Sequence, residues 1–157
     1  MSFRTENPLP LGAWLIHFYV KGSPKAQPRP RATAFGGRAR IYSPSTANKW
    51  KELIALEALE NRPVKPFEGP IRVTASFVFK RPLSHFFKRV SGLVKRPDVP
   101  YWHTSKPDRD NLEKALLDTL TNCKFWKDDC QVVTGEINKI YANEKFSEGC
   151  YVTVEEL

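Results

Sequence analysis

Two aspartates and a lysine lie close together in the segment from residue 106 to 114, KPDRDNLEK. Pro107 keeps the chain out of helix just before Asp108, and in an extended stretch residues two apart project to the same side. We therefore expect the carboxylates of Asp108 and Asp110 to converge. Lys114 lies four residues after Asp110, so on a helix it shares the face of that aspartate. Carboxylates beside a cation are suited to holding a divalent metal ion against a phosphate group.

A second acidic pair, Asp128 and Asp129, precedes a strand predicted to begin at Gln131. We expect the loop after the intervening helix to return this pair to the start of that helix. Three carboxylates and a lysine in one place suit Mg²⁺, because this hard ion binds oxygen, keeps several waters and bridges to substrate phosphate. The alternative is structural: Asp110 is only a helix N-cap, while Asp108 and the second pair occupy turns.

A histidine, His103, lies five residues before Asp108. Because neutral imidazole binds metal ions and accepts protons near neutral pH, this residue is a candidate metal ligand or general base. A loop histidine is also a common surface residue without either role. Both interpretations stay open at the level of the sequence.

Positive charge is concentrated in the first two thirds of the chain. The sequence has 25 Lys and Arg against 17 Asp and Glu, a net charge of +8, yet residues 1–105 carry +12 and residues 106–157 carry −4. Cations combined with an acidic cluster fit an enzyme that acts on phosphodiesters, because the cations attract the backbone and the carboxylates hold a metal ion. Basic loops are predicted at 21–44 and 80–107. The residues in them that we expect to contact DNA are Lys25, Arg29, Arg31, Arg38, Lys88, Arg89 and Lys106.

Length and composition indicate one globular domain, because 157 residues with 41% apolar content suffice for a single core. The cysteines at 123, 130 and 150 form no CxxC pair, so we expect reduced, buried thiols rather than disulfides or a zinc site. No apolar stretch approaches the about 18 residues of a membrane span, and the N-terminus lacks the apolar core of a secretory signal. A cytosolic protein without a membrane partner is therefore expected.

The hydrophobic pattern predicts a single α+β (mixed α/β) domain over residues 1–157, with an N-terminal tail at 1–12. It consists of a mixed β-sheet flanked by helices, in the order β-α-β-α-β-β. Repeated prolines, and the Gly36–Gly37 pair, are expected to prevent regular structure in the basic loops except for a short strand at 40–43. The second loop is expected to be mobile unless ligand binding orders it. The last two strands are expected to pair as a hairpin through 143–149. The predicted elements are strand 14–20, helix 46–61 capped by Ser45, strand 71–79, helix 110–122, and strands 131–141 and 150–154.

Two segments resemble the RusA family of Holliday junction resolvases. Lys106–Asp118 is close to the family pattern KPDxDNLxKxxxDAL, and Phe125–Val132 resembles the DDxQ-type element that opens a strand in that family. Gly22–Arg31 and Trp50 are also similar to the family, though less specifically. The resemblance therefore covers roughly residues 15–141.

The resemblance implies a RusA-like fold and a homodimer that binds four-way DNA junctions and nicks two opposed strands symmetrically. It implies Mg²⁺ as the cofactor, with Mn²⁺ able to substitute. Because many members are encoded by phages or prophages, a bacterial or phage-encoded protein acting at the nucleoid in the cytoplasm is expected. The DNA contacts of the long basic stretch 83–102 are not implied. The implied site residues are Asp108, Asp110 and Asp129 as metal ligands, with Asp128 as second choice for the third ligand, and Lys114 as the catalytic lysine.

The favoured hypothesis is a Mg²⁺-dependent, structure-selective endodeoxyribonuclease that resolves four-way junctions by paired symmetric nicks in DNA recombination and repair. The main alternative is a non-catalytic protein that binds branched or single-stranded nucleic acid through basic loops and aromatic side chains, which leaves the acidic residues unexplained. A glycosyl- or nucleotidyl-transferase is a further alternative, because DxD with Mg²⁺ also holds nucleoside diphosphates, but no glycine-rich phosphate loop accompanies the motif. The aromatic residues concerned are Phe86, Phe87, Tyr101 and Trp102.

Overall fold

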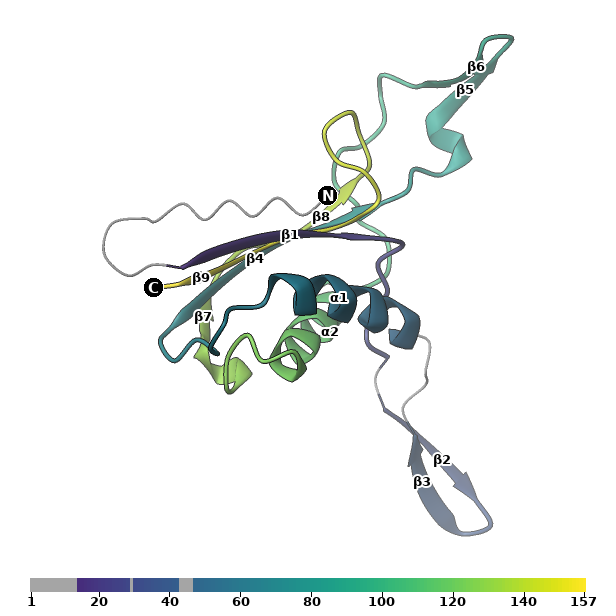
Figure 1. Cartoon of the computed structure of the whole chain (residues 1–157). Coiled ribbons are helices and arrows are strands. Elements are labelled where there is room, and N and C mark those ends of the chain that lie inside the picture. Colours follow the sequence, from purple (N-terminus) through teal and green to yellow (C-terminus); the bar gives the residue numbers. More distant parts are fainter. Residues whose placement is uncertain (1–13, 29, 43–46) are drawn as a thin grey trace.

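Two helices pack against one face of a five-stranded sheet in the computed structural model, which describes residues 14–28, 30–42 and 47–157. Figure 1 shows both helices below the sheet and two hairpins that extend away from this body. The sheet contains β1 (Leu15–Lys21), β4 (Ile71–Phe79), β7 (Val132–Thr134), β8 (Ile137–Tyr141) and β9 (Gly149–Glu156). The remaining elements are β2 (Arg31–Phe35), β3 (Arg38–Tyr42), α1 (Asn48–Asn61), η2 (Leu83–His85), β5 (Phe86–Arg89), β6 (Gly92–Lys95), α2 (Arg109–Asn122) and η3 (Asp129–Gln131).

The sheet is mixed, as the sequence predicts. Its order is β1-β9-β4-β7, and β8 pairs with β4 on the same side as β7. β9 runs antiparallel to both β1 and β4, whereas β7 and β8 run parallel to β4. Strand β4 is therefore central, and its alternating burial gives way to three consecutive buried residues at its carboxyl end. The α+β class expected from the hydrophobic pattern is confirmed.

The core lies between the sheet and the two helices. On α1, Trp50, Ile54 and Ala58 are buried at the spacing of one helix face. The buried stripe of α2 is apolar except for Thr119, whose hydroxyl donates to the carbonyl oxygen of Ala115 at 2.7 Å. That hydrogen bond satisfies a polar group that would otherwise be costly to bury. The buried residues of α2 are Leu112, Ala115, Leu116, Thr119 and Leu120.

The expected hairpin between the last two strands is not formed. Strand β4 lies between β8 and β9, so the connection through 143–149 passes across the end of β4 instead of making a tight pair. The predicted strand 131–141 is also divided into β7 and β8 around Gly135. This glycine has φ +148°, and a Cβ atom there would lie 1.7 Å from the carbonyl oxygen of Val73. Close approach to β4 therefore requires glycine at the break.

Both basic loops contain a hairpin, whereas the sequence predicts irregular structure there except for a short strand at 40–43. Arg31 to Tyr42 forms β2 and β3, joined at Gly36–Gly37 with φ values of +59° and +74°. Two glycines with positive φ are what a two-residue hairpin turn needs, so the pair promotes the strands that it was expected to prevent. In the second loop, β5 and β6 pair in register from Phe86↔Lys95 to Arg89↔Gly92. The predicted order of strands and helices in the body is compatible with the structure once these hairpins are added.

The helix boundaries differ slightly from the expected ones. α1 begins at Asn48 instead of residue 46, and α2 begins at Arg109 instead of Asp110. The predicted cap Ser45 and the tail 1–12 lie outside the described residues. In the described ranges, neither helix combines the length and the apolar character that crossing a membrane requires.

The cysteines are unpaired, as expected. Cys123 and Cys150 are buried, and burial raises the pKa of both thiols. Cys130 is exposed, which corrects the expectation that all the thiols are buried. Its position in the surface turn η3, beyond the core, accounts for the difference.

Replacing Gly135 by alanine should destabilise the protein strongly, because the new Cβ atom would collide with backbone of the central strand. Gly92→Ala is the matched control: it has a positive φ of +116°, but no atom lies within 4 Å of the added Cβ. The control should lose at most about 1–3 kcal/mol of unfolding free energy, which is the cost of a strained backbone conformation. Urea unfolding followed by circular dichroism measures both, and equal losses would contradict the steric explanation.

Candidate active site

The first turn of α2 presents the two aspartates of the DxD motif to solvent. Asp108 occupies the N-cap position in extended conformation, with φ −69° and ψ 144°, but its side chain makes no capping hydrogen bond. Asp110 lies inside the first turn of α2 and not at the N-cap position. The alternative in which Asp110 is only a helix N-cap is therefore wrong. Asp108, Asp110 and Lys114 are all exposed. Lys114 follows Asp110 by one helical turn, so the predicted shared face is present.

A groove of about 490 Å³ adjoins Asp108. One wall is the segment that follows β1, where the Gln27 N–H donates to the carbonyl oxygen of Asn111 at 3.1 Å and so joins this segment to α2. Two of the cations predicted to contact DNA, Lys25 and Lys106, line the groove together with Asp108. The groove therefore combines a carboxylate with positive charge. Its lining residues are Ser23, Pro24, Lys25, Ala26, Gln27, Pro28, Phe79, Lys106, Pro107, Asp108 and Asn111.

Lys139, on β8, is a cation near Asp108 that no motif in the sequence indicates. Burial lowers the pKa of Lys139, and the nearby Asp108 carboxylate opposes this effect. The Lys139 ammonium also donates to the carbonyl oxygen of Ser105 at 2.6 Å. Only the parallel register of β8 on β4, in which Lys139 is opposite Phe77, brings this lysine to the segment before α2. No periodicity in the sequence signals that pairing.

His103 is half-buried in an aromatic cluster. Its ring stacks on Phe79 with centroids 4.0 Å apart and meets the ring of Tyr141 edge-on at 4.9 Å. Burial, followed by the charge of Lys139, lowers the pKa of His103. Its Nδ1 atom is buried without a hydrogen-bond partner. These contacts favour a packing role over the predicted role as a ligand or general base.

The second acidic pair lies in the turn η3, beyond the other end of α2. Asp128 caps this turn: its carboxylate accepts from the Cys130 N–H at 2.9 Å, and the Gln131 side chain accepts from the Asp128 N–H at 3.2 Å. The hydrogen bonds from Cys130 are the main cause that lowers the pKa of Asp128. Because Asp128 has this structural role, Asp129 is the better candidate of the two for a metal ligand.

Within one chain, Asp129 does not return to the start of α2. The neighbouring Gln131 side chain donates to the carbonyl oxygens of Phe67 and Gly69, and β7 pairs with β4 at Ile71, so η3 lies beside the beginning of β4. Asp108 instead shares its groove with Phe79 at the end of β4. At about 3.3 Å per residue, the two ends of this strand are about 26 Å apart. The expected return of the loop is therefore wrong.

The described residues contain no group of three or more His, Cys, Asp or Glu side chains placed to hold a metal ion. One chain supplies two aspartates at one end of α2 and a third at the other. The oxygen donors suit Mg²⁺ in type, but a single chain leaves the predicted ligand set incomplete.

Comparison with known proteins identifies the family. The family model described as Endodeoxyribonuclease RusA matches residues 21–155, which include the whole groove, α2 and η3. This chain belongs to the RusA family. The match extends across both basic hairpins and most of the sheet, so it is not confined to the DxD segment.

Two relatives of this RusA family member are proteins of bacteria and their phages. The uncharacterized protein YqaN of Bacillus subtilis is 34% identical over 133 residues, which cover 82% of this chain and 89% of that protein. A protein of Lactococcus phage r1t named crossover junction endodeoxyribonuclease rusA is 24% identical over 127 residues, or 80% and 86% of the two chains. The alignments span nearly the whole length of both relatives.

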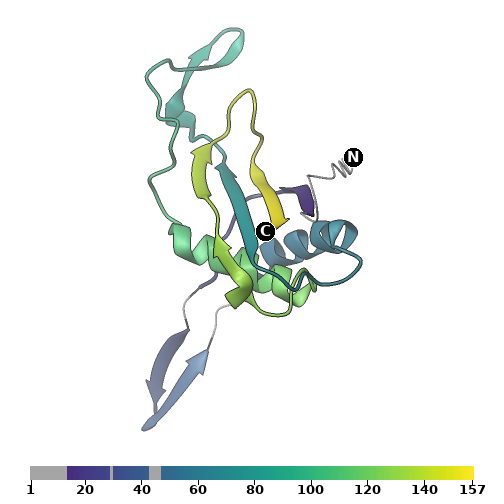
Figure 2. The ribbon, with the colours of Figure 1, turned by 90° about the vertical axis from the view of Figure 1, so that its left-hand side faces the viewer.

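Four of the other predicted DNA contacts lie on the hairpins of this RusA domain. Arg31 and Arg38 are exposed on β2 and β3, and Lys88 and Arg89 are exposed on β5. Arg29 lies outside the described residues. The hairpins project from opposite sides of the body, β5–β6 at the top and β2–β3 at the bottom of both views (Figures 1 and 2). Their cations are therefore spread over a surface wider than the body alone.

His103 should make the stability of the protein depend on pH. Its pKa in the folded state is below the ordinary value of 6.5, so the unfolded state binds a proton more readily and stability falls as the pH drops through that value. Urea unfolding at pH 7.5 and 5.5 measures the loss. His103→Phe retains an aromatic ring for packing, and its stability should fall less over this interval. An equal fall in both proteins would contradict the assignment.

Proposed function

We propose that this RusA family member is a Mg²⁺-dependent endodeoxyribonuclease that resolves four-way DNA junctions by paired symmetric nicks, in recombination and repair in the bacterial cytoplasm. The observation that carries the proposal is the exposed DxD motif on α2, in which the Asp108 carboxylate does not cap the helix and adjoins a groove lined by cations. The name of the phage relative, a crossover junction endodeoxyribonuclease, supports the same activity.

The distribution of the aspartates supports a homodimer in which two copies share each metal site. Asp108 and Asp110 of one copy would form one part of the ligand set, and Asp129 of the second copy would complete it. A twofold dimer creates two identical sites of this kind, because every contact in it occurs twice. Two sites related by a twofold axis also match the approximate twofold symmetry of a four-way junction.

The residues of the site have separate roles in the proposed reaction. When bound, Mg²⁺, or Mn²⁺ in its place, would neutralise charge on the scissile phosphate and lower the pKa of a water molecule. Lys114 presents its ammonium on the same helix face as Asp110, where it either stabilises charge that develops on the phosphate or assists the nucleophile or leaving group. Lys25 and Lys106, which line the groove, hold the DNA backbone beside these groups.

Incubation with a synthetic four-way junction tests the activity directly. In Mg²⁺ the protein should nick two opposed strands of the junction and leave a linear duplex of the same sequence intact, and EDTA should prevent the nicks. Denaturing gels with each strand labelled in turn locate the cuts. Binding of the junction without any cleavage in Mg²⁺ or Mn²⁺ would reject the nuclease and support the non-catalytic nucleic-acid-binding alternative.

Complementation between inactive variants tests the shared site. Asp108→Asn and Asp129→Asn should each abolish cleavage as homodimers, because each removes a metal ligand from both sites. A heterodimer of the two, purified with two different affinity tags after co-expression, should regain one intact site and nick one strand. This result requires that Asp108 and Asp129 of one site come from different chains.

A second heterodimer is the control. Asp108→Asn with Lys114→Met should stay inactive, because both residues lie on the first turns of α2 and belong to the same part of the site. Failure of the Asp108→Asn and Asp129→Asn pair to regain activity, in an otherwise active wild-type dimer, would show that each site lies within one chain.

A further inference from the structure

The β5–β6 hairpin leaves the body with apolar side chains facing solvent. Val90, in its two-residue turn, is fully exposed, and Leu93 and Val94 on β6 are 52% and 46% exposed. Phe87 on β5, opposite Val94, is 40% exposed. An isolated two-stranded hairpin is at best marginally stable in water, and exposed apolar side chains at its tip suggest that a partner covers them.

The charge of the hairpin indicates what kind of partner this is. Residues 80–96 contain six Lys and Arg and no Asp or Glu. The guanidinium groups of Arg89 and Arg96 lie over the Phe87 ring, 5.3 and 5.2 Å from its centroid, and Lys88 is directly opposite Leu93. Cations and apolar groups therefore alternate on the same small surface. This combination fits DNA, which offers phosphates beside apolar base faces.

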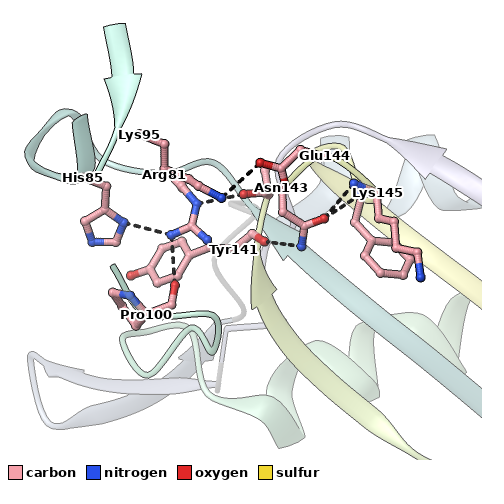
Figure 3. Close-up of polar contacts among 10 residues, drawn as sticks. Arg81, His85, Lys95, Pro100, Tyr141, Asn143, Glu144 and Lys145 are labelled. Carbon is pink, nitrogen blue, oxygen red and sulfur yellow. Dashed lines mark hydrogen bonds and ion pairs between the residues drawn. The ribbon is translucent and has the colours of Figure 1, made fainter. Parts of the chain in front are cut away.

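Buried Arg81 holds the base of the hairpin in place. Its guanidinium donates to the carbonyl oxygens of Ala142 at 2.8 Å and Pro100 at 2.9 Å, and it lies 3.3 Å from Nδ1 of His85 (Figure 3). The same group is stacked over the Tyr141 ring. These contacts hold both ends of the segment that carries the hairpin against the end of the sheet. The base of the hairpin is therefore fixed in position.

A second groove, of about 500 Å³, lies at this base. Lys95, Arg96 and Lys145 line it, and Lys95 forms an ion pair with Glu144 at 3.1 Å. Figure 3 shows Lys95 and Lys145 on either side of the turn that carries Glu144. The groove has more cations than acids, so it suits a phosphate backbone that runs toward the hairpin.

We propose that the β5–β6 hairpin is a wedge that contacts unstacked bases at the branch point of the junction through Val90 and Leu93, while its cations hold the adjoining phosphates. The inference rests on the proposed function. Apolar side chains that enter between base steps must overcome stacking, and this cost is least where bases are already unpaired. In the sequence the hairpin is inserted between Phe79 and Asp108, which both line the first groove, so the segment that carries the wedge starts and ends at the candidate active site.

Fluorescence of 2-aminopurine placed at the branch point tests the wedge. Ca²⁺ replaces Mg²⁺ so that binding is measured without cleavage. Wild-type protein should raise the fluorescence on binding a four-way junction, and the Val90→Ser, Leu93→Ser double variant should lose most of this rise. The double variant should also bind the junction about tenfold more weakly, since two apolar side chains lose their burial, and bind a linear duplex as before.

Two control proteins separate the apolar contact from other effects. Val64→Ser removes an equally exposed valine from the connection between α1 and β4, and it should change neither the fluorescence nor the affinity. Lys88→Gln with Arg89→Gln should weaken binding to junction and duplex alike, because phosphate contacts do not distinguish them. Thermal unfolding of each variant checks that the fold is intact.

Three outcomes would overturn the wedge. The first is an unchanged fluorescence response in the double variant, and the second is an equal loss of affinity for junction and duplex. The third is a fall from dimer to monomer in sedimentation, which would make the apolar tip a contact between two copies of the chain. These readouts require no cleavage. An inactive wild-type protein would therefore reject the proposed nuclease without deciding the role of the hairpin.

Discussion

Strand β4 pairs with β9 on one side and with β7 and β8 on the other, so its backbone sets the position of almost every other part of the molecule. Its carboxyl end, at Phe79, reaches the groove beside Asp108. Its amino end, at Ile71, lies beside the turn that carries Asp129. A strand this long cannot bring its two ends together. The separation of the acidic residues is therefore a property of the core, and loop movement alone cannot remove it.

The two ends of β4 are also held by different kinds of interaction. At the amino end, the side-chain amide of Gln131 bridges η3 to two carbonyl oxygens of the preceding connection. At the carboxyl end, Arg81 joins the hairpin base to the sheet through two carbonyl oxygens and an aromatic face. In both places a buried or half-buried polar side chain satisfies backbone groups that have no partner in the sheet. Each end of the strand thus has a rigid support of its own.

Much of the body could be predicted from the sequence because its signals are local. The spacing of Asp110 and Lys114 within a helix, and the alternation along β4, depend only on the period of the backbone. The pairing of β8 with β4 has no local signal, and it is this pairing that places Lys139 near Asp108. The Gly36–Gly37 pair does not by itself predict the first hairpin, because glycines that end a strand also form hairpin turns. The position of Asp129 depends on the long-range path of the chain, which spacing does not reveal.

The placement of Asp108 and Asp129 near opposite ends of β4 also bears on how the activity of the proposed dimer would depend on protein concentration. In the proposed dimer, a ligand set divided between two chains would make a lone subunit inert. Below the dissociation constant of the dimer, the number of complete sites grows with the square of the protein concentration. Cleavage by the proposed dimer would therefore depend on protein concentration more steeply than cleavage by an enzyme whose site lies within one chain.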